Sequence, residues 1–118
     1  MLANFNPISE LYVSDEKAKK LKNDAAGLVS LNLTPRQICD LELLLNGAFN
    51  PLKGFLTRDD YNSVVECMRL ANGALWPIPI TLDVCQRFSD QLEIGQNVAL
   101  RDLEGVILAT MTISDIWK

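Results

Sequence analysis

Apolar residues in the first part of the chain have the spacing of an amphipathic helix. Ala18, Leu21 and Ala25 recur at helical intervals and fall on one face. Ser14 precedes them and is a favoured N-cap residue, because its hydroxyl can accept a hydrogen bond from a free amide of the first turn. Gly27 follows them and suits a left-handed C-cap. The pattern therefore predicts a helix between Ser14 and Gly27.

The clearest helix start in the sequence is at residues 34–37, which read TPRQ. The threonine can cap the helix, proline is favoured at the first helical position, and the glutamine completes a capping box. The expected apolar face consists of Ile38, Leu41, Leu44 and Leu45. Asn46 and Gly47 are typical of a helix end, so the helix should stop there.

A third helix is expected after Thr57. Asp59 and Asp60 would lie in its first turn, where the helix dipole favours negative charge. The predicted apolar stripe consists of Tyr61, Val64, Val65 and Met68. This helix start explains the paired carboxylates without a metal ion.

Further along, the period of the pattern changes to two. Between residues 78 and 84, apolar residues alternate with proline, threonine and aspartate, which predicts a half-buried strand. Pro79 lacks an amide hydrogen, so that strand should lie at an edge. A hairpin is predicted from Asn97–Arg101 and Val106–Ile113, joined by a turn at Asp102–Gly105.

Helices in the first part and mainly antiparallel strands in the second define an α+β fold class. A short apolar run, Leu28–Leu31, adds a strand between the first two helices. The length of 118 residues fits one domain spanning residues 1–118.

The charge balance disfavours nucleic acid as a partner. The chain has 11 Lys and Arg against 15 Asp and Glu, a net charge of −4, whereas nucleic-acid binding needs a basic face. No apolar run is long enough to span a bilayer, and the N-terminus lacks the pattern of a secretory signal. We therefore expect a cytoplasmic protein without a membrane partner.

Residues that commonly carry chemistry are sparse. The chain has no histidine, which excludes Ser-His and Cys-His pairs, and it contains neither GxGxxG nor a phosphate-binding GxxxxGKS/T loop. Cys39, Cys67 and Cys85 are widely spaced and form no CxxC pair, so we expect buried free thiols in a reducing compartment. No catalytic, cofactor-binding or metal-binding residue is predicted.

The strongest candidate for a functional loop is the segment 50–55, which reads NPLKGF. Proline fixes φ, glycine permits a tight turn, and the lysine could reach a phosphate or sulfate. The simpler interpretation is a structural turn whose apolar residues pack between two helices. A third hypothesis is that Asn50, Pro51, Lys53 and Phe55 contact another domain.

Four segments distinguish this chain from a generic α+β domain. They read RQICDLEL at 36–43, NGAFNPLKGFL at 46–56, YNSVVE at 61–66 with MRL close behind, and WPIPITLDV at 76–84. In this order they resemble the N-terminal region of the sulfate adenylyltransferase (ATP sulfurylase) family. The resemblance covers the chain from about Leu31 to Trp117.

The resemblance implies a PUA-like pseudo-barrel in a longer enzyme of sulfate assimilation. That enzyme joins ATP and sulfate into adenosine 5'-phosphosulfate and pyrophosphate. In the family a following α/β domain holds ATP-Mg and sulfate through Gln-x-Arg-Asn-Pro and His-x-x-His motifs, and neither motif occurs here. We therefore expect a non-catalytic fragment, with a barrel truncated at its C-terminus. Its expected partner is the catalytic domain of the same polypeptide. A fused adenylylsulfate kinase and a homo-oligomer are both compatible with the sequence.

The alternative is a free-standing PUA-like RNA-binding or dimerisation module. PUA-type barrels elsewhere bind RNA, so fold analogy allows this function. The net charge and the lack of a basic strand with interleaved aromatic residues argue against RNA. A truncated barrel would leave an unpaired sheet edge, which could pair with a second copy.

Overall fold

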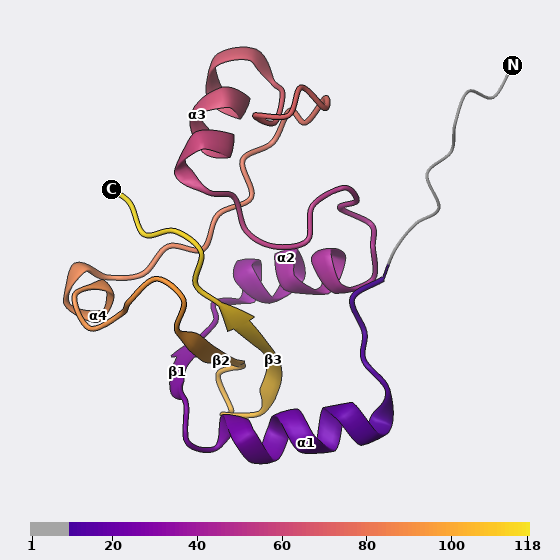
Figure 1. Cartoon of the computed structure of the whole chain (residues 1–118), viewed down its shortest axis with the longest axis vertical. Coiled ribbons are helices and arrows are strands. Elements are labelled where there is room, and N and C mark those ends of the chain that lie inside the picture. The colour runs from indigo at the N-terminus through magenta and orange to yellow at the C-terminus, as the bar shows by residue number, and fades with distance from the viewer. Residues whose placement is uncertain (1–9) are drawn as a thin grey trace, which may run out of the picture.

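The computed structural model describes residues 10–118, which form four helices and three strands (Figure 1). In chain order these are α1 (Asp15–Ala25), β1 (Val29–Asn32), α2 (Pro35–Leu45), α3 (Arg58–Cys67), α4 (Gln86–Ser89), β2 (Asn97–Arg101) and β3 (Ile107–Thr112). The α+β class predicted from the sequence is confirmed.

The three strands form one mixed sheet in the order β1-β2-β3. β2 and β3 pair antiparallel as the predicted hairpin, and Gly105 in the connecting turn has a φ of 88°, which favours glycine. β1 pairs with β2 in parallel, with Val29 opposite Val98. This parallel partner comes from the first part of the chain, so the sheet is mixed where an antiparallel one was expected. The side chain of Arg101 reinforces the pairing, since its Nε donates to Ser30 Oγ at 2.8 Å.

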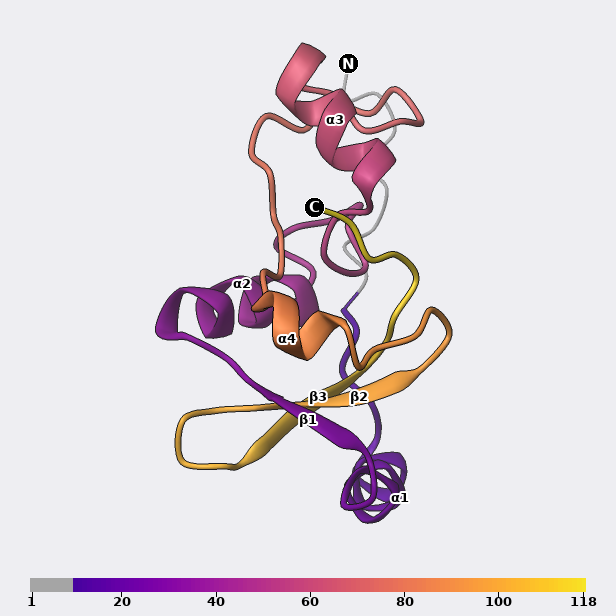
Figure 2. The ribbon, with the colours of Figure 1, turned by 90° about the vertical axis from the view of Figure 1, so that its left-hand side faces the viewer.

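The sheet lies between α1 on one side and α2 with α4 on the other (Figure 2). α1 packs against β3. α3 lies beyond α2, at the end of the molecule opposite α1 (Figure 1). The molecule is therefore layered, with the sheet near one end and α3 at the other.

The predicted capping box at the start of α2 is present. The Thr34 hydroxyl accepts a hydrogen bond from the Gln37 amide at 3.3 Å, and Gln37 Oε1 accepts one from the Thr34 amide at 2.9 Å. Gln37 is only 4% exposed, and its Nε2 also donates to the carbonyl of Asp83 at 3.2 Å. Both the Oε1 and the Nε2 atom of this buried glutamine thus have hydrogen-bond partners. Such partners offset the cost of burying polar atoms.

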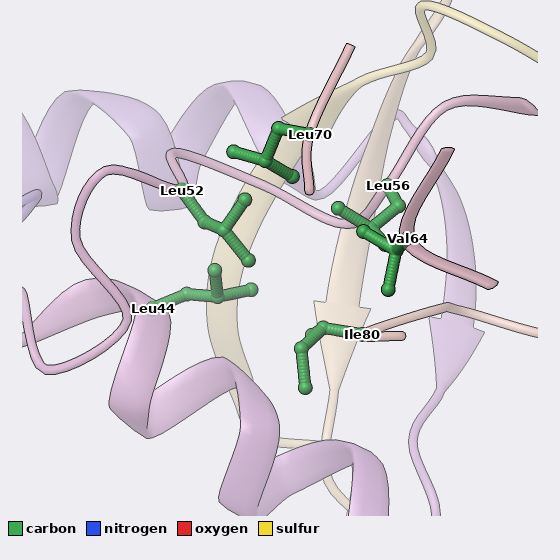
Figure 3. Close-up of a cluster of buried hydrophobic side chains, with 6 residues drawn as sticks. All are labelled: Leu44, Leu52, Leu56, Val64, Leu70 and Ile80. Atoms are coloured by element: carbon green, nitrogen blue, oxygen red, sulfur yellow. The ribbon is translucent and has the colours of Figure 1, made fainter. Parts of the chain in front are cut away.

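Two clusters of buried side chains form the core. The sheet cluster comprises Leu33, Leu41, Val98, Leu100 and Ile113. The α3 cluster comprises Leu44, Leu52, Leu56, Val64, Leu70 and Ile80, whose side chains point toward one another (Figure 3). Full burial of such side chains stabilises the fold by about 1.5–3 kcal/mol each. α2 joins the clusters, because Leu41 lies in one and Leu44 in the other.

Two helix ends differ from the prediction. Gly27 does not take a left-handed conformation. The α1 C-cap is Ala26 in the right-handed region, and a tightened turn satisfies the last carbonyls, with the Leu28 amide donating to Ala25 at 3.1 Å. In α3, Val65 is 60% exposed and Met68 is 57% exposed. Met68 is the C-cap with a φ of 56°, so its backbone is no longer helical and its side chain does not continue the apolar face of α3.

The strand predicted for residues 78–84 is wrong, because this segment pairs with no strand of the described residues. Pro79 has no amide to donate, and the backbone contact here joins the Leu56 amide to the Ile80 carbonyl at 2.8 Å. The alternation still marks burial, since Ile80 belongs to the α3 cluster and Leu82 packs on the sheet cluster. The segment therefore contributes side chains to both clusters without joining the sheet.

The prediction of buried thiols is also wrong, because Cys39, Cys67 and Cys85 are all free and exposed. Cys67 is the last residue of α3 and Cys85 is the N-cap of α4. Both positions are element ends, where side chains are less covered than in the middle of a packed face.

Candidate functional site

The segment 50–55 connects α2 to α3 and is a well-anchored turn. The Asn50 amide donates to the Gly47 carbonyl at 3.0 Å, and the Leu52 amide donates to Phe49 at 2.8 Å. Leu52 is buried in the α3 cluster, and Phe55 packs against both clusters. The apolar residues of this segment therefore have the packing role that the simpler interpretation gave them.

The polar residues predicted for this segment do not gather at one place. Lys53 and Phe55 line a cleft, whereas Asn50 and Pro51 do not. Pro51 and Lys53 are exposed, and Asn50 is partly buried. The peptide bond between Asn50 and Pro51 is cis. Of the four proposed contact residues, only two face the same concave surface.

That cleft has a volume of about 1010 Å³ and lies between the sheet and α3. One wall comes from the segment 53–56 and Tyr61 of α3, and another from α4 with Phe88. The segment 110–118, including Trp117, closes a further side. Sequence reasoning missed Tyr61, Phe88 and Trp117 as site residues. No local sequence pattern identifies them as site residues, because they come from α3, α4 and the segment after β3, which are far apart in the sequence.

The carboxylates of the cleft already have donors. Asp115 Oδ2 accepts from the Arg58 amide at 2.8 Å, and Asp90 Oδ1 accepts from Gln86 Nε2 at 2.7 Å. Asp83 forms a salt bridge with Arg36 at 3.0 Å. Both partners of that bridge are largely exposed, so it adds little to stability. Each of these three carboxylates therefore has a hydrogen-bond or salt-bridge partner within residues 10–118.

Among residues 10–118, no group of three or more His, Cys, Asp or Glu side chains is arranged to hold a metal ion. The cleft is lined by aromatic and aliphatic side chains together with polar and charged ones, among them Lys53, Asp90 and Asp115. The lysine at its edge, Lys53, forms no salt bridge within these residues.

A family model described as the PUA-like domain matches residues 3–118, which is nearly the whole sequence. The chain belongs to the PUA-like domain family. This PUA-like domain contains the mixed sheet, the capped α2 and the cleft described above.

The similar proteins include sulfate adenylyltransferases. A sulfate adenylyltransferase of Eremothecium gossypii is 49% identical over 102 residues, which is 86% of this chain and 20% of that protein. The sulfate adenylyltransferase of Saccharomyces cerevisiae is 52% identical over 87 residues, 74% of this chain and 17% of that protein. The resemblance predicted from the four sequence segments is confirmed.

A solved structure, a hexameric APS kinase from Thiobacillus denitrificans, superposes with a TM-score of 0.85 at 42% sequence identity. The match covers 94% of this chain and 22% of that one. The PUA-like domain therefore spans about a fifth of the length of the proteins it resembles. Within residues 10–118, no helix is long and apolar enough to span a bilayer.

Proposed function

We propose that this PUA-like domain is the N-terminal part of a sulfate adenylyltransferase. The whole enzyme joins ATP and sulfate into adenosine 5'-phosphosulfate and pyrophosphate. The observation that supports this most strongly is an identity of about 50% over most of the chain to two fungal enzymes of that name. Because the chain spans only a fifth of their length, the activity belongs to the longer protein.

Within that enzyme, the domain acts as a structural and interdomain module. The sequence has no histidine, and the cleft carboxylates serve as hydrogen-bond acceptors for the fold. ATP-Mg and sulfate would bind in another domain of the same cytoplasmic polypeptide. That catalytic domain is the expected partner of this one. The hexameric assembly of the structural relative supports a homo-oligomeric parent.

The segment 50–55 is proposed to contact the catalytic domain. Lys53 is exposed at the edge of the cleft and Phe55 lines its wall, while Leu52 fixes the turn by its burial. Because hydrogen bonds and burial already fix this turn, docking would cost little backbone conformational entropy. The contact would centre on Lys53 and Phe55 and leave Asn50 and Pro51 at its rim.

The alternative remains a free-standing RNA-binding or dimerisation module. RNA binding would need a basic face, and the net charge of −4 disfavours it. Dimerisation would use a sheet edge, and β1 and β3 are the outer strands of the described sheet.

Two assays, one on the purified 118-residue chain and one on the full-length protein, test the proposal. With ATP, Mg²⁺ and either sulfate or molybdate, the chain should release no pyrophosphate above background, because it lacks the residues for adenylyl transfer. The full-length protein should release pyrophosphate under the same conditions. Turnover by the chain alone would contradict its non-catalytic role, and a full-length protein without sulfate-dependent turnover would contradict the proposed enzyme.

In a filter-binding titration at low salt, the chain should retain no RNA. Retention that weakens as salt rises would favour the RNA-binding alternative.

A further inference from the structure

α3 stands apart from the other regular elements of the described residues. Figures 1 and 2 show it beyond α2, on the far side of that helix from the sheet. Its buried side chain, Val64, belongs to the α3 cluster, which joins Leu44 of α2 with Leu52 and Leu56 before α3 and with Leu70 and Ile80 after it. Most of the side chains clustered with Val64 therefore lie in connecting segments, and the position of α3 depends on the contacts that fix those segments.

The segment 113–117 reaches from the sheet to α3. Ile113 is buried in the sheet cluster, directly after β3. Two residues later, Asp115 Oδ2 accepts a hydrogen bond from the backbone amide of Arg58 at 2.8 Å. Trp117 then lies on Tyr61, with ring centroids 4.6 Å apart and planes tilted by 44°. The chain is thus fixed to the sheet at one end and to α3 at the other.

The contact with Asp115 gives α3 a second cap. Thr57 supplies the local cap, because its hydroxyl accepts from the Asp60 amide at 3.4 Å. Asp115 satisfies a different free amide, that of the first helical residue, from a distant part of the chain. A carboxylate is also the favoured charge at this end of a helix. Thr57 therefore caps the start of α3 locally, whereas Asp115 links α3 to the segment that leaves the sheet.

The same segment forms one side of the cleft. Asp115 and Trp117 line it together with Tyr61 of α3 and Phe88 of α4. A movement of α3 away from the sheet would break the contacts of Asp115 and Trp117 and widen this space. Phe55 packs on both clusters and also lines this space.

We propose that the segment 113–117 is a latch that fixes α3 over the sheet and thereby sets the width of the cleft. With the latch closed, α3 has one position and the cleft has the shape described above. With the latch open, α3 moves on its connecting segments while the sheet cluster stays intact. The latch depends on these contacts alone and is independent of the proposed enzyme.

The exposed cysteines allow a direct test. Cys67 ends α3 and Cys85 is the N-cap of α4, and both accept a spin label when Cys39 is replaced by serine. Double electron–electron resonance on the labelled 118-residue chain should give a single narrow distance. Asp115→Ala and Trp117→Ala should each replace it with a broad distribution that extends to longer distances. Circular dichroism checks that the helices and the sheet persist.

Two matched variants separate the latch from general loosening. Asp115→Asn keeps a side-chain oxygen that can accept from Arg58, so it should retain the narrow distance. Ser114→Ala changes an exposed neighbour whose side chain forms no hydrogen bond among the described residues. This variant should therefore also give the narrow distance. An unchanged narrow distance in Asp115→Ala, which alters no buried core residue, overturns the proposal. Equal broadening in Ser114→Ala overturns it as well.

Discussion

Leu100 and Leu103 are close in sequence and have opposite surroundings. Leu100 is 1% exposed within the sheet cluster, whereas Leu103 is 70% exposed in the β2–β3 turn. Leu100→Ala should lower the free energy of unfolding by roughly 2–5 kcal/mol, because it removes buried surface and leaves a cavity. Leu103→Ala should change that free energy by less than about 0.5 kcal/mol. Urea denaturation of both variants measures the two changes in the free energy of unfolding. Changes of similar size would contradict the burial described for Leu100.

At the residue scale, the sequence predicted buried side chains more accurately than it predicted exposed ones. Leu41 and Leu44 were expected in the core and lie there, because helical spacing reports a face directly. Val65 satisfied the same spacing and is exposed, whereas the neighbouring Val64 is the residue that α3 buries. Cys67 was expected to be buried from residue type alone, and its position at a helix end overrides that tendency.

At the element scale, the capping box of α2 gives a sharp prediction. Thr34→Ala should cost about 1 kcal/mol of stability, because the Gln37 amide loses its acceptor. Thr34→Ser keeps the hydroxyl and should cost much less. Thermal denaturation measures the loss of stability in each of the two variants. A serine variant as unstable as the alanine variant would show that the threonine methyl, and not the cap, is responsible.

Elements with local chemical signals were predictable. The caps Thr34 and Thr57 and the turn glycine Gly105 each determine a boundary through their own hydrogen bonds or φ angle. α4 was missed because it has four residues and no side-chain cap. The residues 78–84 alternate as a strand does, yet pairing depends on a neighbour that no local pattern can specify.

At the scale of the whole molecule, the contact proposed for the segment 50–55 can be measured by hydrogen exchange. In the full-length protein, the amides of Lys53, Gly54 and Phe55 should exchange more slowly than in the 118-residue chain, because docking would cover them. The hairpin turn Asp102–Gly105, whose residues 103–105 are exposed, serves as the internal control, and its amides should exchange at the same rates in both proteins. Equal rates at Lys53 to Phe55 would remove the interdomain role.

The arrangement of distant segments was beyond sequence reasoning. Tyr61, Phe88 and Trp117 meet at one cleft only because α3, α4 and the end of the chain converge there. The parallel pairing of β1 with β2 is equally non-local. The family resemblance implied the fold class, but the positions of these contacts required the structure.

That parallel pairing also has a consequence for the order of synthesis. Val29 pairs with Val98 and Asn32 with Arg101, so β1 leaves the ribosome long before its partner exists. Until Arg101 has emerged, the amides and carbonyls of β1 have only water to bond with, whereas the residues of the α3 cluster all precede β2 and can already pack α2 and α3 together. A nascent chain stalled before β2 would therefore carry helices and an open strand, and the sheet would close only when translation passes Arg101.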